Sequence, residues 1–172
     1  MSFRTFFDAG WYVFVEDEAK ILVTQSVELV EREQRLRSEF HDYSFVVFPM
    51  AKAYESFLKK FLFTIGLIDR NQYEHRQFRI GRSLNPDIPV RHRNEFWLYE
   101  ELAGACGPEL ARRLWDNWLD SRNHLFHYFP EVKSNITLSQ AEDLMTKLSQ
   151  AMSEALLCVN KRKVDSSGSL KF

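Results

Sequence analysis

The chain has 172 residues, of which 45% are hydrophobic and 15% aromatic, so it can form one domain whose core needs no metal or disulfide staple. Lysine and arginine total 23, against 24 aspartate and glutamate residues. This balance excludes the overall basic field of a dedicated duplex binder, so any contact with nucleic acid has to come from a local patch.

Residues 1–15 are crowded with aromatic side chains and are expected to form either a short helix or an extended arm packed on the body. Residues 16–39 are expected to be helical, because acidic residues stand at their start, where a helix favours negative charge. The acidic side of this stretch is either a solvated face or a surface for the basic loop of a second copy. From Met50, apolar residues recur at helical spacing as far as Gly66, a plausible stop, and Pro49 either begins that helix or kinks it.

Residues 69–96 have no clear period and are expected to form a long connection, a kind of segment that is often functional. Between residues 70 and 93, six arginines face only two acids, Glu74 and Asp87. Any contact with RNA is therefore expected to use this connection. The arginines we expect to bind RNA are Arg76, Arg79, Arg82, Arg91 and Arg93. For the run from Arg91 to Arg93, a solvated loop is an equal alternative.

Three further helices are predicted at residues 97–105, 108–129 and 139–160. The second starts at Pro108 and ends before Pro130, and the third has Ser139 and Glu142 as a capping box. Because no strand pattern is present, the expected fold is an all-α helical bundle of about four to six helices. An arm and first helix, residues 1–39, join a helical domain, residues 40–160, in one compact unit, and residues 161–172 are expected to form a flexible tail.

Cys106 and Cys158 form no motif and are expected to be separate, buried small side chains. No apolar run approaches the roughly 18 residues of a membrane span, and the start of the chain does not resemble a targeting segment. We therefore expect a cytoplasmic protein with no membrane partner, no metal and no cofactor.

On a helical wheel, Arg122 falls inside the apolar arc of residues 108–129, while Asn123 and His127 lie beyond its edge on one shared side. A guanidinium in an apolar arc needs a partner or a function. Glu55, at the rim of the apolar face of the helix from Met50, can supply that partner if the two helices pack, and Lys59 extends the same polar seam.

These residue types suit the cleavage of RNA by its own 2′-hydroxyl. A histidine can move the protons, and an arginine can stabilise the charge that develops on phosphorus. Asn123 can orient His127 or hold a phosphate oxygen. Two alternatives remain. Arg122 can form an ion pair with a purely structural role, or His124 and His127 can hold a metal, although no further cluster of ligands is visible in the sequence.

The segment from Arg122 to His127 resembles the R-(four to six residues)-H motif of the HEPN superfamily, in which a polar residue often follows the arginine, as Asn123 does. Residues 53–60 and 78–86 are similar to the HEPN domain of RNase LS-type toxins. The resemblance covers roughly residues 40–160. Those toxins carry extra N-terminal domains, whereas this chain has room for only a short N-terminal arm.

The resemblance implies a metal-independent endoribonuclease, a hydrolase of toxin–antitoxin or antiviral defence systems. It assigns catalysis to Arg122, Asn123 and His127, and the helical wheels add Glu55 and Lys59 as supporting residues. It also implies RNA as substrate, a homodimer whose two motifs face one cleft, and an antitoxin protein as a possible partner. The alternative is a catalytically silent HEPN interaction module that binds a partner protein or a nucleotide.

Overall fold

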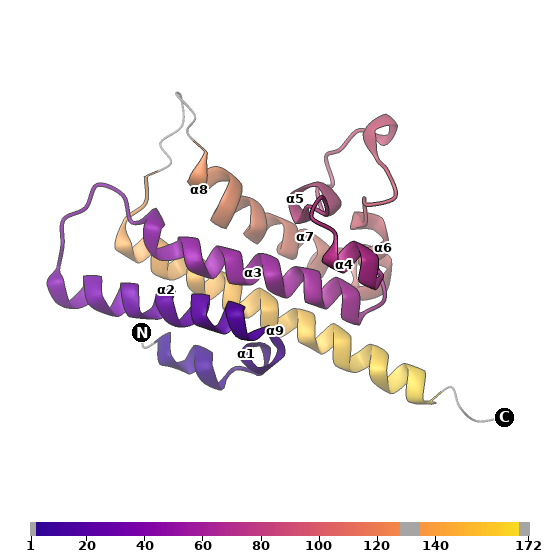
Figure 1. The fold of residues 1–172 in the computed structure, drawn as a ribbon, viewed down its shortest axis with the longest axis horizontal. Helices are drawn as coiled ribbons and strands as arrows, with labels where there is room; N and C mark the ends of the chain where they lie inside the picture. The colour runs from indigo at the N-terminus through magenta and orange to yellow at the C-terminus, as the bar shows by residue number, and fades with distance from the viewer. Residues whose placement is uncertain (1–2, 128–134, 169–172) are drawn as a thin grey trace.

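The computed structural model describes residues 3–127 and 135–168, with side chains as far as Arg162, and every regular element in these ranges is helical (Figure 1). The predicted all-α class is confirmed. In chain order the elements are η1 (Phe3–Asp8), α1 (Gly10–Phe14), α2 (Asp17–Leu36), α3 (Ser44–Thr64), α4 (Arg70–Glu74), α5 (Ile80–Ser83), η2 (Val90–His92), α6 (Tyr99–Cys106), α7 (Pro108–Trp118), η3 (Leu119–Asn123), α8 (His124–Phe126) and α9 (Leu138–Gly168).

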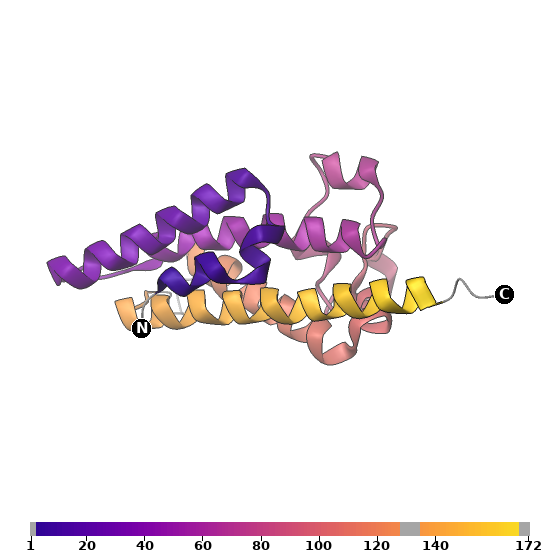
Figure 2. The ribbon, with the colours of Figure 1, turned by 90° about the horizontal axis from the view of Figure 1, so that it is seen from below.

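Helix α3 forms the centre of the bundle and packs against α2, α9 and the segment from α7 to η3 (Figures 1 and 2). Its buried residues surround the helix rather than forming one stripe, as is typical of a helix covered on several sides. Many of its aromatic and aliphatic side chains, among them Tyr54, Phe57 and Phe61, are fully buried. Their burial is the main source of cohesion between the layers.

Pro49 lies inside α3, one turn after its start, and neither begins the helix nor ends it. A proline ring disturbs the hydrogen bonds of the preceding turn. The buried hydroxyl of Ser26, on α2, lies in this gap. It donates to the carbonyl of Val46 at 2.8 Å and accepts from the backbone N–H of Met50 at 2.9 Å. One side chain of α2 thus links the two groups that an unbroken helix would pair with each other.

The aromatic N-terminal segment is helical and packs on α9, which decides between the two predicted forms. Phe3, Phe6 and Trp11 are buried in edge-to-face contact. The indole N–H of Trp11 donates to the hydroxyl of Ser149 at 3.0 Å, so its polar edge is satisfied within the core.

The ends of the helices agree with prediction in some places and differ in others. Gly66 has a φ of 78° and closes α3, as predicted, with backbone bonds from Gly66 to Phe63 and from Leu67 to Leu62. Pro108 begins α7, as predicted, whereas α6 covers Tyr99–Cys106 rather than the expected residues 97–105.

The predicted capping box of the last helix is wrong. Thr137 and Gln140, two residues before the expected pair of Ser139 and Glu142, exchange backbone and side-chain hydrogen bonds at 2.8 and 3.2 Å. Helix α9 also continues to Gly168, through most of the stretch expected to form a tail, and residues 169–172 lie outside the described ranges.

Cys106 and Cys158 form a disulfide with 5.6 Å between their Cα atoms, and both are only half-buried. The expectation of two separate buried thiols is therefore wrong, and the cysteines give no support to a reducing compartment. None of the described helices is both long and apolar enough to cross a bilayer.

Candidate functional site

The helix that carries Arg122 changes its geometry just before it reaches that residue. After α7, residues Leu119–Asn123 form the π-helical turn η3, in which the backbone N–H of His124 bonds to the carbonyl of Leu119, five residues back. The buried hydroxyl of Ser121 donates to the carbonyl of Asn117 at 2.6 Å, so this carbonyl, which lies just before the widened turn, has a hydrogen-bond partner. Single π-turns inside helices are frequent at functional sites.

The predicted contact between the two helices is confirmed. The Nη1 atom of Arg122 lies 3.2 Å from Oε2 of Glu55, which projects from α3. The Arg122 side chain is 37% exposed, so the guanidinium is not held inside the apolar core as the wheel suggested. Water therefore screens this pair, and part of the guanidinium remains accessible to a ligand.

Lys59 extends the seam along α3, one turn beyond Glu55. Its ammonium lies 5.7 Å from the centre of the Phe78 ring, in a cation–π contact. Burial and the positive charge of Arg79 lower the pKa of Lys59, whereas Glu55 acts in the opposite direction. We call Arg122, Glu55, Lys59 and Arg79 the charged row; it holds three cations and one acid.

The basic connection is folded and reaches the helix that carries Arg122. A Cβ atom added to Gly81, in α5, would lie 2.2 Å from a ring atom of Trp118, so only glycine fits here. This close approach places α5 against the end of α7 (Figure 1). The indoles of Trp118 and Trp115 are stacked with 5.4 Å between their centres. Trp115 is buried, as expected of a core residue.

The arginines of the connection divide into two groups. Arg70 pairs with Glu74, while Arg93 pairs with Glu100 at 3.1 Å and stacks 3.7 Å from the centre of the Trp97 ring. Arg93 also donates to the carbonyl of Ile88 at 3.0 Å, so it holds the loop together and is a poorer candidate for RNA contact than predicted. The arginines of the second group, which pair with no carboxylate among the described residues, are Arg76, Arg79, Arg82 and Arg91.

The two histidines near Arg122 have different surroundings. The predicted helix to residue 129 is too long: α8 ends at Phe126, and His127 is exposed on extended backbone, with φ −109° and ψ 134°. Asn123, half-buried, closes the π-turn, so the shared helical side proposed for it and His127 does not exist. Residues 128–134, including Pro130, lie outside the described ranges.

Asp120 was not among the predicted site residues. Its carboxylate lies 3.2 Å from Nδ1 of His124, four residues later. A carboxylate in this position fixes the ring orientation of a histidine. The spacing D-x-x-x-H was the available signal. Within the described ranges, no third His, Cys, Asp or Glu joins these two side chains in a cluster that could hold a metal.

Comparisons with protein-family models, with curated proteins and with solved structures found no match.

Proposed function

We propose that the chain is a metal-independent endoribonuclease of the HEPN type that cleaves RNA as a homodimer. The observation that carries the proposal is the position of Arg122: a π-turn holds it 3.2 Å from Glu55, with its guanidinium partly exposed and two histidines in the same short segment. A guanidinium placed in this way can bind a phosphate oxygen and stabilise negative charge that develops there.

In the proposed reaction, a histidine accepts the proton of the ribose 2′-hydroxyl, whose oxygen attacks the adjacent phosphorus. The 5′-oxygen leaves and takes up a proton, so the products are a 2′,3′-cyclic phosphate and a 5′-hydroxyl. Arg122 binds the non-bridging oxygens, and Asn123 assists. His127 is the first candidate for the proton transfer, and His124, oriented by Asp120, is the second.

Cations of the charged row and of the basic connection supply the contact with the rest of the RNA. Lys59 and Arg79 continue the charged row, and Arg76, Arg82 and Arg91 pair with no carboxylate in the part of the chain that the structure describes. Phosphate contacts made by such side chains weaken as salt rises, because bound counterions are released when they form. The biological setting we propose is toxin–antitoxin or antiviral defence, with an antitoxin protein as partner.

A catalytically silent interaction module is the second candidate, and the ion pair with Glu55 favours it, because it gives Arg122 a structural role. In that case, replacement of Arg122 alters the binding of a partner protein or nucleotide and no RNA is cleaved.

The test incubates purified protein with labelled single-stranded RNA in excess EDTA. We expect cleavage with cyclic phosphate ends, and a loss of about 10²–10⁴-fold in Arg122→Ala and in one of His127→Ala and His124→Ala. Arg112→Ala is the matched control, because Arg112 pairs with Asp116 on the surface of the same helix, and it should cleave at the wild-type rate. Absence of cleavage, or cleavage that EDTA abolishes, would refute the proposal.

A further inference from the structure

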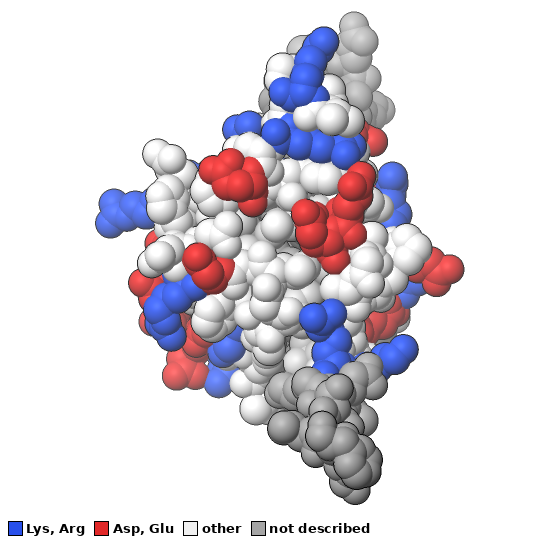
Figure 3. Space-filling view, turned by 90° about the vertical axis from the view of Figure 1, so that its right-hand side faces the viewer, with Lys and Arg blue, Asp and Glu red and all other residues white. Residues whose placement is uncertain are grey.

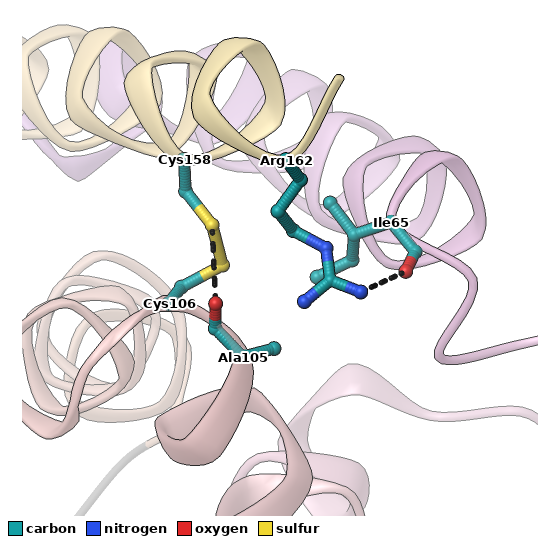
Figure 4. The surroundings of a disulfide bond; sticks show 5 residues. All are labelled: Ile65, Ala105, Cys106, Cys158 and Arg162. Atoms are coloured by element: carbon teal, nitrogen blue, oxygen red, sulfur yellow. Dashed lines mark hydrogen bonds between the residues drawn. A yellow bond between two sulfur atoms is a disulfide. The ribbon is translucent and has the colours of Figure 1, made fainter. Parts of the chain in front are cut away.

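The disulfide joins the end of α6 to the distal half of α9 (Figure 4). Cys106 is the last residue of α6, and Cys158 lies 52 residues later. The chain between them includes α7, η3 and α8, so the covalent loop that the bond closes contains the whole segment from Arg122 to His127.

Apart from the disulfide, the contacts described for this end of α9 include the packing of its core-facing residues as far as Val159 and polar contacts of Glu154 and Arg162. Val159 is its last buried residue among the described side chains, and Asn160 to Arg162 are exposed. Arg113 and Glu154 form an ion pair, but their side chains are 51% and 38% exposed, and such pairs contribute little. The guanidinium of Arg162 donates to the carbonyl of Ile65 at 3.5 Å, a long hydrogen bond (Figure 4). The covalent bond is thus the strongest link between α6 and this part of α9.

Both sulfur-bearing residues line a groove of about 570 Å³ between α6 and α9, and Cys106 also lines a second groove of about 290 Å³. Gly104 and Gly107 leave the α6 side of the first groove open, since a Cβ atom at either would meet nothing within 4 Å. The end of the molecule beyond α6 and α9 has charges of both signs around an uncharged middle (Figure 3). A small thiol can therefore approach the bond from the α6 side of this groove.

We propose that Cys106–Cys158 is a thiol–disulfide exchange site, and that its reduction releases the distal end of α9 from α6. Accessible disulfides are the class that exchanges reversibly, whereas buried ones serve as permanent staples. The proposal is independent of any ribonuclease activity.

The co-reactant is a dithiol, either a small molecule or a protein with two neighbouring cysteines. One of its thiolates attacks a sulfur of the bond, forming a mixed disulfide and expelling the other cysteine as a thiolate. The second thiolate of the dithiol then attacks the mixed disulfide and expels the remaining cysteine. Two electrons and two protons pass to Cys106 and Cys158, and the dithiol becomes a disulfide.

The test compares the wild-type chain in its oxidised form and under dithiothreitol. Alkylation with N-ethylmaleimide, read by mass, should add no label to the oxidised chain and two labels to the reduced chain, and dilution into a mild oxidant should restore the bond. Limited trypsin digestion then reports on α9. Cleavage after Lys161 and Arg162 should become at least about tenfold faster on reduction, as expected for local opening of a helix end.

Two controls separate local release from unfolding. Cleavage after Arg112, in the middle of α7, should stay slow in both forms. The double variant Cys106→Ser with Cys158→Ser should be cleaved after Lys161 at the fast rate with or without dithiothreitol.

Three results would overturn the proposal. In the first, the folded chain does not form the bond, or keeps it in reducing glutathione buffers until it unfolds. In the second, reduction leaves cleavage after Lys161 unchanged. In the third, reduction speeds cleavage after Arg112 as well as after Lys161, or the double variant is unfolded. Either finding would mean that the bond maintains the whole fold.

Discussion

Removal of the Ser26 hydroxyl should destabilise the chain far more than an ordinary surface substitution. Ser26 is fully buried, and its hydroxyl bonds at 2.8 Å to the carbonyl of Val46 and at 2.9 Å to the N–H of Met50. In Ser26→Ala, both backbone groups lose that partner inside the core. Each lost bond costs about 1 kcal/mol, and each buried group left unpaired adds to it, so we expect a loss of about 2–4 kcal/mol. Urea denaturation followed by circular dichroism measures this value.

The same reasoning predicts that the loss depends on Pro49. In Pro49→Ala, the ring is gone and the N–H of Met50 is able to reach the carbonyl of Val46 directly, as in an ordinary helix. The loss of unfolding free energy caused by Ser26→Ala should then be smaller in the Pro49→Ala background than in the wild type, by at least about 1 kcal/mol. A double-mutant cycle in which the two changes add to within about 0.5 kcal/mol would show that Ser26 does not repair the proline turn.

Four further outcomes are expected. Arg122→Ala should lower the free energy of unfolding by no more than about 1 kcal/mol in urea, because its ion pair is partly exposed; a larger loss would favour the structural role. Gly81→Ala should lower stability by about 1–3 kcal/mol through overlap with Trp118. Gly104→Ala, in a helix with open space beside it, should raise stability by about 0.5–1 kcal/mol, and thermal melts that place the two glycine variants in the reverse order would contradict the packing. Burial raises the pKa of Tyr54 well above its usual value, so above about pH 10 the unfolded chain loses a proton that the folded chain keeps, and stability falls as pH rises. Tyr54→Phe should show a smaller fall in its urea midpoint across that pH range, and equal falls would rule out this source.

The parts of the structure that local periodicity controls were predictable. The apolar repeat after Met50 and the start at Pro108 placed two helices, and their facing positions led to the contact between Glu55 and Arg122, which is confirmed. Gly66 ended its helix as expected, because the positive φ needed at that position costs little for a glycine.

The errors have identifiable physical causes. The helical wheel assumes about 100° per residue, and the π-turn breaks that phase before Arg122, so positions beyond it, His127 included, were misplaced. The stretches from Thr137 to Gln140 and from Ser139 to Glu142 both fit a capping box, and only the packed structure selects one. The disulfide joins residues that no local pattern relates, because its formation depends on how α6 meets α9.

The π-turn also places a constraint on the length of the chain. A π-turn holds one residue more than an α-helical turn, so deletion of a single residue between Leu119 and Asn123 would restore a regular helix. Because that turn would then hold the ordinary number of residues, the side chains on both sides of the deletion would largely keep their directions, and Arg122 would still face Glu55. In an alignment of homologous chains, a one-residue gap at this place is therefore compatible with the Arg122–Glu55 contact wherever both side chains are retained, whereas a gap elsewhere in α7 would shift Arg122 by roughly 100° around the helix.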